Sequence, residues 1–188
     1  MNMNLVKYIF LWCLCIGFNS CAMDKVYYID YFNNPSTGLS IQQSTLNWIY
    51  KLQYRTPEFM ALIELGNSNF STSEFNEIAD KYQEIDYYLL TIQGKKSSSF
   101  IEKKQLINHL SFDFKHQINQ VTKYDSIIPV LYHFENGFDA LGEFRCLLGF
   151  TKQGINDKQI AIKFFDNDKN IEFMISSQAI ASIPTLDI

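Results

Sequence analysis

The spacing of apolar residues changes near residue 110, and this change constrains the fold more than any other feature of the sequence. Between residues 75 and 92, apolar side chains recur every three or four positions, which places them on one face of a helix. From Leu110 to Ile118, apolar and polar residues alternate, as in a strand with one buried face. This order predicts an α+β fold, with N-terminal helices packed on a C-terminal antiparallel sheet of about five strands.

Capping signals predict where the helices begin. A serine followed three residues later by glutamine or glutamate forms a capping box, and this pair begins at Ser40 and at Ser71. Thr56 and Pro57 suit the N-cap and first position of another helix. The predicted helices cover residues 41–52, 57–65 and 75–92, with a short helix at 101–108.

Alternation and turn residues predict the strands. The expected strands cover residues 110–118, 127–134, 143–151, 159–165 and 171–176. The second is broken or begun at Pro129, and the last two form a hairpin through residues 166–170. Residues 26–32 are also strand-like, and they either pair with the sheet or bind a partner. A turn at 33–38 follows them.

The beginning of the chain has the pattern of a secretory signal peptide. Lys7 precedes an apolar run over residues 8–18, which as a helix would extend only ~16 Å, about half the hydrocarbon core of a bilayer. A positive segment, a short apolar segment and a small residue before a cleavage site are typical of an export signal. The sequence therefore predicts an exported protein whose leader is residues 1–20.

The end of this leader, Phe18-Asn19-Ser20-Cys21, resembles the lipobox of bacterial lipoproteins. The resemblance implies cleavage before Cys21 and acylation of its thiol, with palmitate among the acyl chains, so that the chain is anchored in the membrane. Phe18 and Asn19 depart from the usual residues of the family, which leaves an ordinary secreted protein and an uncleaved anchor as alternatives. Because Ala22 and not aspartate follows the cysteine, the resemblance favours the outer membrane, facing the periplasm. The expected organisation is a signal peptide (1–20), a lipidated tether with a first extended segment (21–39) and a single α+β domain (40–188).

Composition limits the function classes. Removal of residues 1–20 from the 188 leaves 168 residues, enough for one domain with its own core. The leader contains one lysine and no acidic residue, so the net charge changes from −4 to −5 and makes nucleic acid a poor partner. Cys13 and Cys15 leave with the leader, and the Cys21 thiol is the expected acylation site. Only Cys146 then remains, so an internal disulfide is excluded. The 16 Phe and 11 Tyr residues can supply a packed core instead.

Residue types with catalytic or metal-binding potential have simpler structural explanations. Cys146 lies in an alternating strand between Phe144 and Leu148, where a thiol behaves as a small apolar group. His116 falls on the apolar face of its predicted strand, where a buried histidine is expected. The loop beginning at Asp166 resembles a calcium loop but lacks its glycine and its final glutamate. We therefore predict no metal, no cofactor and no catalytic residue.

One segment combines aromatic and acidic residues at the end of a predicted strand, where binding loops often lie. The candidate binding residues are Tyr132, His133, Phe134, Glu135, Asn136, Phe138 and Asp139. They suit contact with a protein or a sugar-like ligand, and they equally suit a loop that folds back over the core.

These observations favour a membrane-anchored, non-catalytic protein-interaction module. Such a module would be an accessory part of an envelope or secretion assembly, or a periplasmic immunity protein that neutralises a toxin. The alternative is a small envelope hydrolase or ligand-binding lipoprotein. Its site would combine His116, His133, Glu135 and Asp139.

Overall fold

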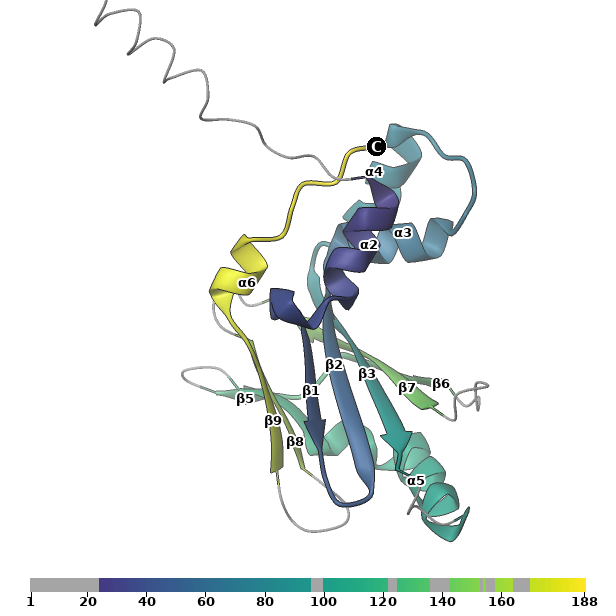
Figure 1. The fold of residues 1–188 in the computed structure, drawn as a ribbon, viewed down its shortest axis with the longest axis vertical. Helices are drawn as coiled ribbons and strands as arrows, with labels where there is room; N and C mark the ends of the chain where they lie inside the picture. The colour runs from purple at the N-terminus through teal and green to yellow at the C-terminus, as the bar shows by residue number, and fades with distance from the viewer. Residues whose placement is uncertain are drawn as a thin grey trace, which may run out of the picture.

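The computed structural model describes residues 24–95, 100–121, 125–135, 143–152, 154, 158–163 and 170–188. Two antiparallel sheets and five α-helices account for most of these residues (Figure 1). The predicted α+β class is therefore confirmed. The leader, Cys21, most of the polar loop after Gly94 and the calcium-like loop at 166–169 lie outside the described residues.

Each sheet combines strands that are distant in sequence. In spatial order, the first sheet contains β1 (Ser40–Ser44), β2 (Trp48–Arg55), β3 (Ile85–Gly94), β7 (Glu143–Thr151) and β6 (Leu131–Glu135). The second contains β5 (Ser126–Ile127), β4 (Ile118–Val121), β8 (Lys158–Lys163) and β9 (Asn170–Ile175). The helices are α2 (Lys25–Asn33), α3 (Pro57–Leu65), α4 (Thr72–Asp80), α5 (Phe100–Phe112) and α6 (Ser177–Ala181), with 3₁₀ turns η1 (Pro35–Thr37) and η2 (Phe114–Gln117). Three strands of the first sheet therefore come from the half of the chain that was predicted to be helical.

The segment predicted to be extended, residues 26–32, is the helix α2. Asp24 caps this helix, because its carboxylate accepts hydrogen bonds from the backbone N–H groups of Val26 and Tyr27 at 2.9 and 3.1 Å. Tyr28 and Phe32, one turn apart, are 1% and 0% exposed. A cap and a buried pair at helical spacing outweigh the strand propensity of the aromatic residues.

The predicted helix at 41–52 is wrong, because this segment forms the hairpin of β1 and β2. Trp48, Tyr50, Leu52 and Tyr54 are all buried, which is a period of two. The helical spacing that began at Ile41 combined residues from both faces of the hairpin. The Ser40–Gln43 pair is part of β1 and caps no helix.

The third predicted helix is correct only in its first half. The capping box of Ser71 and Glu74 is present, and α4 follows it. The helix ends at Asp80, and β3 then occupies the centre of the first sheet with Tyr88, Leu90 and Ile92 fully buried. In contrast, the helix at 57–65 matches α3 over its whole length, with the predicted cap at Thr56.

The alternation at 110–118 is not a strand. The predicted short helix continues to Phe112, η2 follows, and only Ile118–Val121 forms a strand. Phe112 is 79% exposed whereas Phe114 is 2% exposed, so the alternating residues do not share one buried face. The expected strand at 143–151 and the hairpin of β8 and β9 are confirmed, and the chain around Pro129 is divided between β5 and β6, in different sheets.

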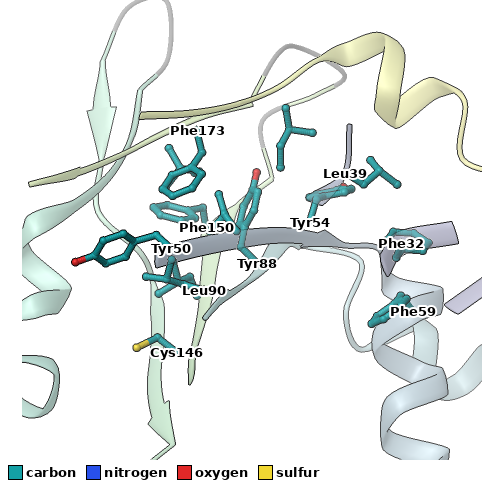
Figure 2. Close-up of a cluster of buried hydrophobic side chains, with 14 of the residues drawn as sticks. Phe32, Leu39, Tyr50, Tyr54, Phe59, Tyr88, Leu90, Cys146, Phe150 and Phe173 are labelled. Carbon is teal, nitrogen blue, oxygen red and sulfur yellow. The ribbon is translucent and has the colours of Figure 1, made fainter. Parts of the chain in front are cut away.

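The core lies between the two sheets and continues to the helices at one end. Figure 2 shows Phe173 of β9 opposite Phe150 of β7 and Tyr50 of β2, with Tyr88, Leu90 and Cys146 nearby. The same cluster extends to Phe32 of α2 and Phe59 of α3, whose rings lie 4.7 Å apart. Among the described residues, no helix is long and apolar enough to cross a membrane.

Candidate functional site

The predicted binding residues on β6 point to two sides of the first sheet. Tyr132 and Phe134 face the core: the Tyr132 hydroxyl donates to the Leu110 carbonyl at 2.5 Å, and the Phe134 ring packs near Phe144. His133 and Glu135 are exposed on the opposite side. Asn136, Phe138 and Asp139 lie outside the described residues. The structure therefore assigns half of the described residues of this segment to packing.

His133 and Glu135 belong to a polar surface that we call the outer sheet face. Strand register places Glu135 opposite Arg145, Arg145 opposite Thr91, and Thr91 opposite Lys51. Directly opposite residues in an antiparallel pair point to the same side, so these four side chains form one row across four strands. The outer sheet face comprises Lys51, Gln53, Arg55, Leu89, Thr91, His133, Glu135, Glu143, Arg145 and Leu147.

A shallow pocket of about 300 Å³ lies on this face. Its walls are formed by Asn33, Lys51, Gln53, Arg55, Leu89, Thr91, Glu143 and Arg145. No local sequence pattern predicts this site, because its residues come from α2, β2, β3 and β7. The one available signal was that Arg55 and Arg145 are the only arginines in the sequence.

The Arg55 side chain is held in place on both sides. Its Nε donates to Gln53 Oε1 at 3.1 Å, and its guanidinium carbon lies 5.2 Å from the centre of the Phe59 ring. Burial lowers the pKa of Arg55 to about 10; the negative charge of Glu135 opposes this change and the positive charge of Arg145 adds to it. Arg55 is therefore a partly desolvated cation with a defined orientation.

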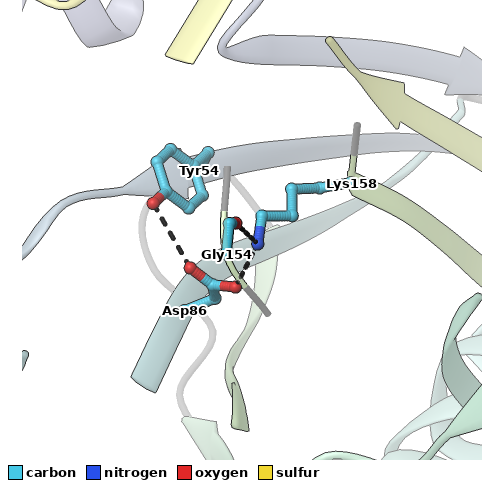
Figure 3. A network of polar contacts seen from close by, with 4 residues as sticks. All are labelled: Tyr54, Asp86, Gly154 and Lys158. Atoms are coloured by element: carbon cyan, nitrogen blue, oxygen red, sulfur yellow. Dashed lines mark hydrogen bonds and ion pairs between the residues drawn. The ribbon is translucent and has the colours of Figure 1, made fainter. Parts of the chain in front are cut away.

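A second polar cluster lies at the opposite side of the first sheet, where a buried ion pair joins the two sheets. Lys158 Nζ of β8 lies 2.7 Å from Asp86 Oδ2 of β3, and the two side chains are 3% and 2% exposed (Figure 3). Lys158 also donates to the Gly154 carbonyl at 2.9 Å, and the Tyr54 hydroxyl donates to Asp86 Oδ1 at 3.4 Å. Burial and the nearby Asp86 charge raise the pKa of Tyr54. These contacts satisfy the charges that burial would otherwise penalise.

A pocket of about 660 Å³ adjoins this ion pair. Tyr54, Asp86, Gly154 and Lys158 contribute to its wall, together with charged residues such as Glu58 and Lys152. This cluster was not predicted either, because Asp86 and Lys158 are 72 residues apart and no local pattern connects them.

Three residues of the alternative hydrolase site are described, and two of them, His133 and Glu135, lie on the outer sheet face. His116 is an exposed residue of η2 and not a buried strand residue, so that prediction is wrong. The buried histidine is His109 of α5, whose pKa is lowered chiefly by burial. Asp139 lies outside the described residues, and the described part of the chain contains no group of three or more His, Cys, Asp or Glu residues that could hold a metal ion.

Cys146 is buried in β7, as expected for a core residue. Its thiol is fully shielded from solvent and lies 3.6 Å from the Tyr132 hydroxyl. Burial raises the pKa of Cys146 to about 12, against a smaller opposing effect of the Tyr132 hydrogen bond. A thiol in this state is a poor nucleophile at neutral pH.

No family model, curated protein or solved structure matches this chain. The function of the chain is therefore inferred from the geometry of the outer sheet face and from the sequence of the leader.

Proposed function

We propose that this protein is a membrane-anchored lipoprotein of the bacterial cell envelope that acts as a non-catalytic protein-interaction module. The outer sheet face is the surface that contacts its partner. The observation that supports this proposal most directly is the row Lys51, Thr91, Arg145 and Glu135, in which cationic, hydroxyl and acidic groups lie side by side on half-buried or exposed positions. Mixed charges of this kind provide specificity and orientation in protein contacts.

The position of Cys21 adds a geometric argument about where this partner lies. Cys21 precedes the α2 cap, Asp24, by three residues, and three residues extend about 10 Å at most. A lipid attached to Cys21 would thus hold the folded part close to the membrane surface, facing the periplasm from the outer membrane. A partner within this distance suits an accessory role in an envelope or secretion assembly, or a periplasmic immunity protein.

Site-specific photocrosslinking in the native membranes tests the proposed surface. We would place benzoylphenylalanine at His133, which is exposed on the outer sheet face, and in a matched variant at Glu172, which is exposed on β9 of the second sheet. The expected result is a discrete crosslinked partner from position 133 and none from position 172. Equal products from both positions, or none from either, would contradict the proposal.

The anchor needs its own test with the same membranes. Intact-mass spectrometry of the purified chain should show an acylated protein that begins at Cys21, and a Cys21→Ser variant should remain unprocessed. The partner should be lost together with the anchor if proximity to the membrane matters. An unacylated protein cleaved elsewhere would exclude the lipoprotein assignment.

The pocket beside Asp86 and Lys158 supports a second candidate, a ligand-binding lipoprotein. Its volume of about 660 Å³ lies within the usual range for small-molecule sites. Fractionated envelope extracts would then raise the unfolding temperature of the wild-type protein but not of a Gln83→Trp variant, in which the indole occupies the pocket. If no fraction acts differently on the two proteins, this candidate is rejected.

A further inference from the structure

We propose that the pocket on the outer sheet face is an oxyanion-binding site, in which Arg55 and Arg145 hold a carboxylate or phosphate group. This inference deepens the proposed function. Only the claim that the partner supplies the oxyanion rests on that function. The site itself does not depend on a protein partner, so an experiment can disprove the oxyanion site and the protein-interaction function independently.

The first observation that supports an oxyanion site is that both arginines of the chain line this pocket. Of the 16 Lys and Arg residues in the sequence, 14 are lysines, and both arginines line this one pocket. They come from β2 and β7, which are separated by β3. Arginine differs from lysine in its planar fork of N–H groups, which matches the two oxygens of a carboxylate or phosphate. The pocket therefore concentrates the residue type that is best suited to oxyanions.

The second observation that supports an oxyanion site is that Arg55 is oriented before any ligand binds. Gln53, which is 5% exposed, accepts the Nε hydrogen bond of Arg55 through Oε1. Its own Nε2 donates to the Phe32 carbonyl and to Asn33 Oδ1 at 3.1 and 2.9 Å. The end of α2 thus fixes Gln53, and Gln53 fixes Arg55. Since Nε is already used, the terminal N–H groups of the guanidinium are left to bind an anion.

The third observation that supports an oxyanion site is the positive charge around the pocket. Lys51, Arg55 and Arg145 contribute three positive charges, against Glu143 in the pocket and Glu135 opposite Arg145 on β6. Glu143 lies 3.6 Å from Arg145, whereas Arg55 and Lys51 form no ion pair within the described part of the chain. The pocket is thus locally positive although the whole chain has a net charge of −4. A bound oxyanion would compensate the cationic charge that partial burial leaves poorly solvated at Arg55.

The test uses the full-length protein in detergent and the ¹⁵N signals of the arginine side chains. Because there are only two arginines, the spectrum contains two Nε–Hε signals, and the variants Arg55→Lys and Arg145→Lys assign them. Inorganic phosphate is added, and potassium chloride at equal ionic strength is the control. We expect both signals to shift saturably with phosphate only. Signals that follow ionic strength alone would overturn the proposal.

The same variants test the role of the guanidinium groups. Each substitution keeps the positive charge and removes the fork, so we expect phosphate affinity to fall about tenfold or more. Lys104→Gln, at an exposed position on α5, is the matched control and should bind like the wild type. Backbone amide spectra report whether each variant is folded. Unchanged phosphate affinity in both folded lysine variants would overturn the assignment of the arginines.

Crosslinking from position 133 separates this inference from the proposed function. If Arg55→Lys also removes the crosslinked partner, the partner presents the oxyanion, and an acidic peptide should compete for the site. If phosphate binds to the wild type but the crosslink persists in Arg55→Lys, the site takes a free oxyanion. The partner then does not present this group. If phosphate binds and the wild type yields no crosslink, the proposed function fails while the oxyanion site stands.

Discussion

Two buried tyrosines differ in whether their hydroxyl groups have a partner. Tyr28 is hydrogen-bonded to Thr56 Oγ1 at 3.0 Å, whereas the buried Tyr88 hydroxyl has no hydrogen-bond partner in the described part of the chain. Burial also raises the pKa of both groups, so both remain neutral. An unsatisfied buried hydroxyl is a cost that the ring's apolar packing has to offset.

We therefore predict opposite effects for the two Tyr→Phe substitutions. Tyr88→Phe removes the unsatisfied hydroxyl and should leave the free energy of unfolding unchanged or raise it by up to ~1 kcal/mol. Tyr28→Phe breaks a buried hydrogen bond and should lower it by about 1 kcal/mol. Urea denaturation measures both. A larger loss for Tyr88→Phe than for Tyr28→Phe would contradict this assignment of partners.

The Cys146 thiol should be unreactive in the native protein. Because the folded-state pKa is about 12, the native protein contains little thiolate at pH 8. In a chain with Cys13, Cys15 and Cys21 changed to serine, a disulfide reagent should not modify Cys146 until the protein is unfolded in denaturant. Rapid modification of the native protein at pH 8 would show that the thiol is accessible and would contradict its burial in the core.

At the scale of elements, the Asp86–Lys158 ion pair connects β3 of the first sheet to β8 of the second. Lys158→Met leaves an uncompensated buried carboxylate, and we expect it to lower the free energy of unfolding by about 3–5 kcal/mol. The double variant Asp86→Leu with Lys158→Met should lose less, since no buried charge remains. Urea denaturation of the wild type, the two single variants Asp86→Leu and Lys158→Met, and the double variant gives the coupling energy between the two side chains.

The Glu143–Arg145 pair supplies the control for this cycle. Its side chains are 21% and 40% exposed, so Glu143→Gln should cost less than about 1 kcal/mol. If the double variant is as unstable as Lys158→Met alone, the ion pair is not the reason for the loss.

The outcome for individual elements shows where local sequence patterns are sufficient. The helices α3 and α4 follow the caps Thr56 and Ser71, where the cap and its flanking residues act within one turn. The strand β7 was also predicted, and its alternating residues Phe144, Cys146, Leu148 and Phe150 are buried as expected. In β2 and β3, however, apolar residues on both faces fit either period, so strand pairing decided the conformation. The site residues were mostly missed for a related reason: Arg55 and Arg145 line the same pocket only when β2, β3 and β7 are paired.

The C-terminal segment is hydrogen-bonded to both α2 and α4, and so connects the end of the chain to its N-terminal half. The Tyr31 hydroxyl of α2 donates to the Ser182 carbonyl at 2.9 Å, and Thr72 Oγ1 at the start of α4 donates to the Ile188 backbone oxygen at 3.2 Å. Figure 1 shows the C-terminal segment returning along α2 to α4. The apolar residues of this segment that pack on the core are Ala179, Ile180, Ile183, Leu186 and Ile188.

Removal of residues 177–188 should therefore destabilise the entire fold and not only its end. Four partly buried aliphatic side chains are lost, and at roughly 1 kcal/mol each the free energy of unfolding should fall by ~4 kcal/mol. Urea denaturation of the truncated chain measures this loss, and Asp187→Asn, at an exposed position, is the control with little effect. A truncated chain with wild-type stability would show that the segment does not support the core.

Local sequence patterns are sufficient to predict the α+β class, the caps of two helices and the core strand β7, and the leader predicts an exported, lipid-anchored protein. These features depend on interactions between residues that are close in the chain, or on a linear motif. In contrast, the strand conformation of β1, β2 and β3 and the pocket shared by the two arginines are seen only in the folded structure. Those outcomes depend on pairing between distant segments, whose free energy exceeds the small differences in local propensity.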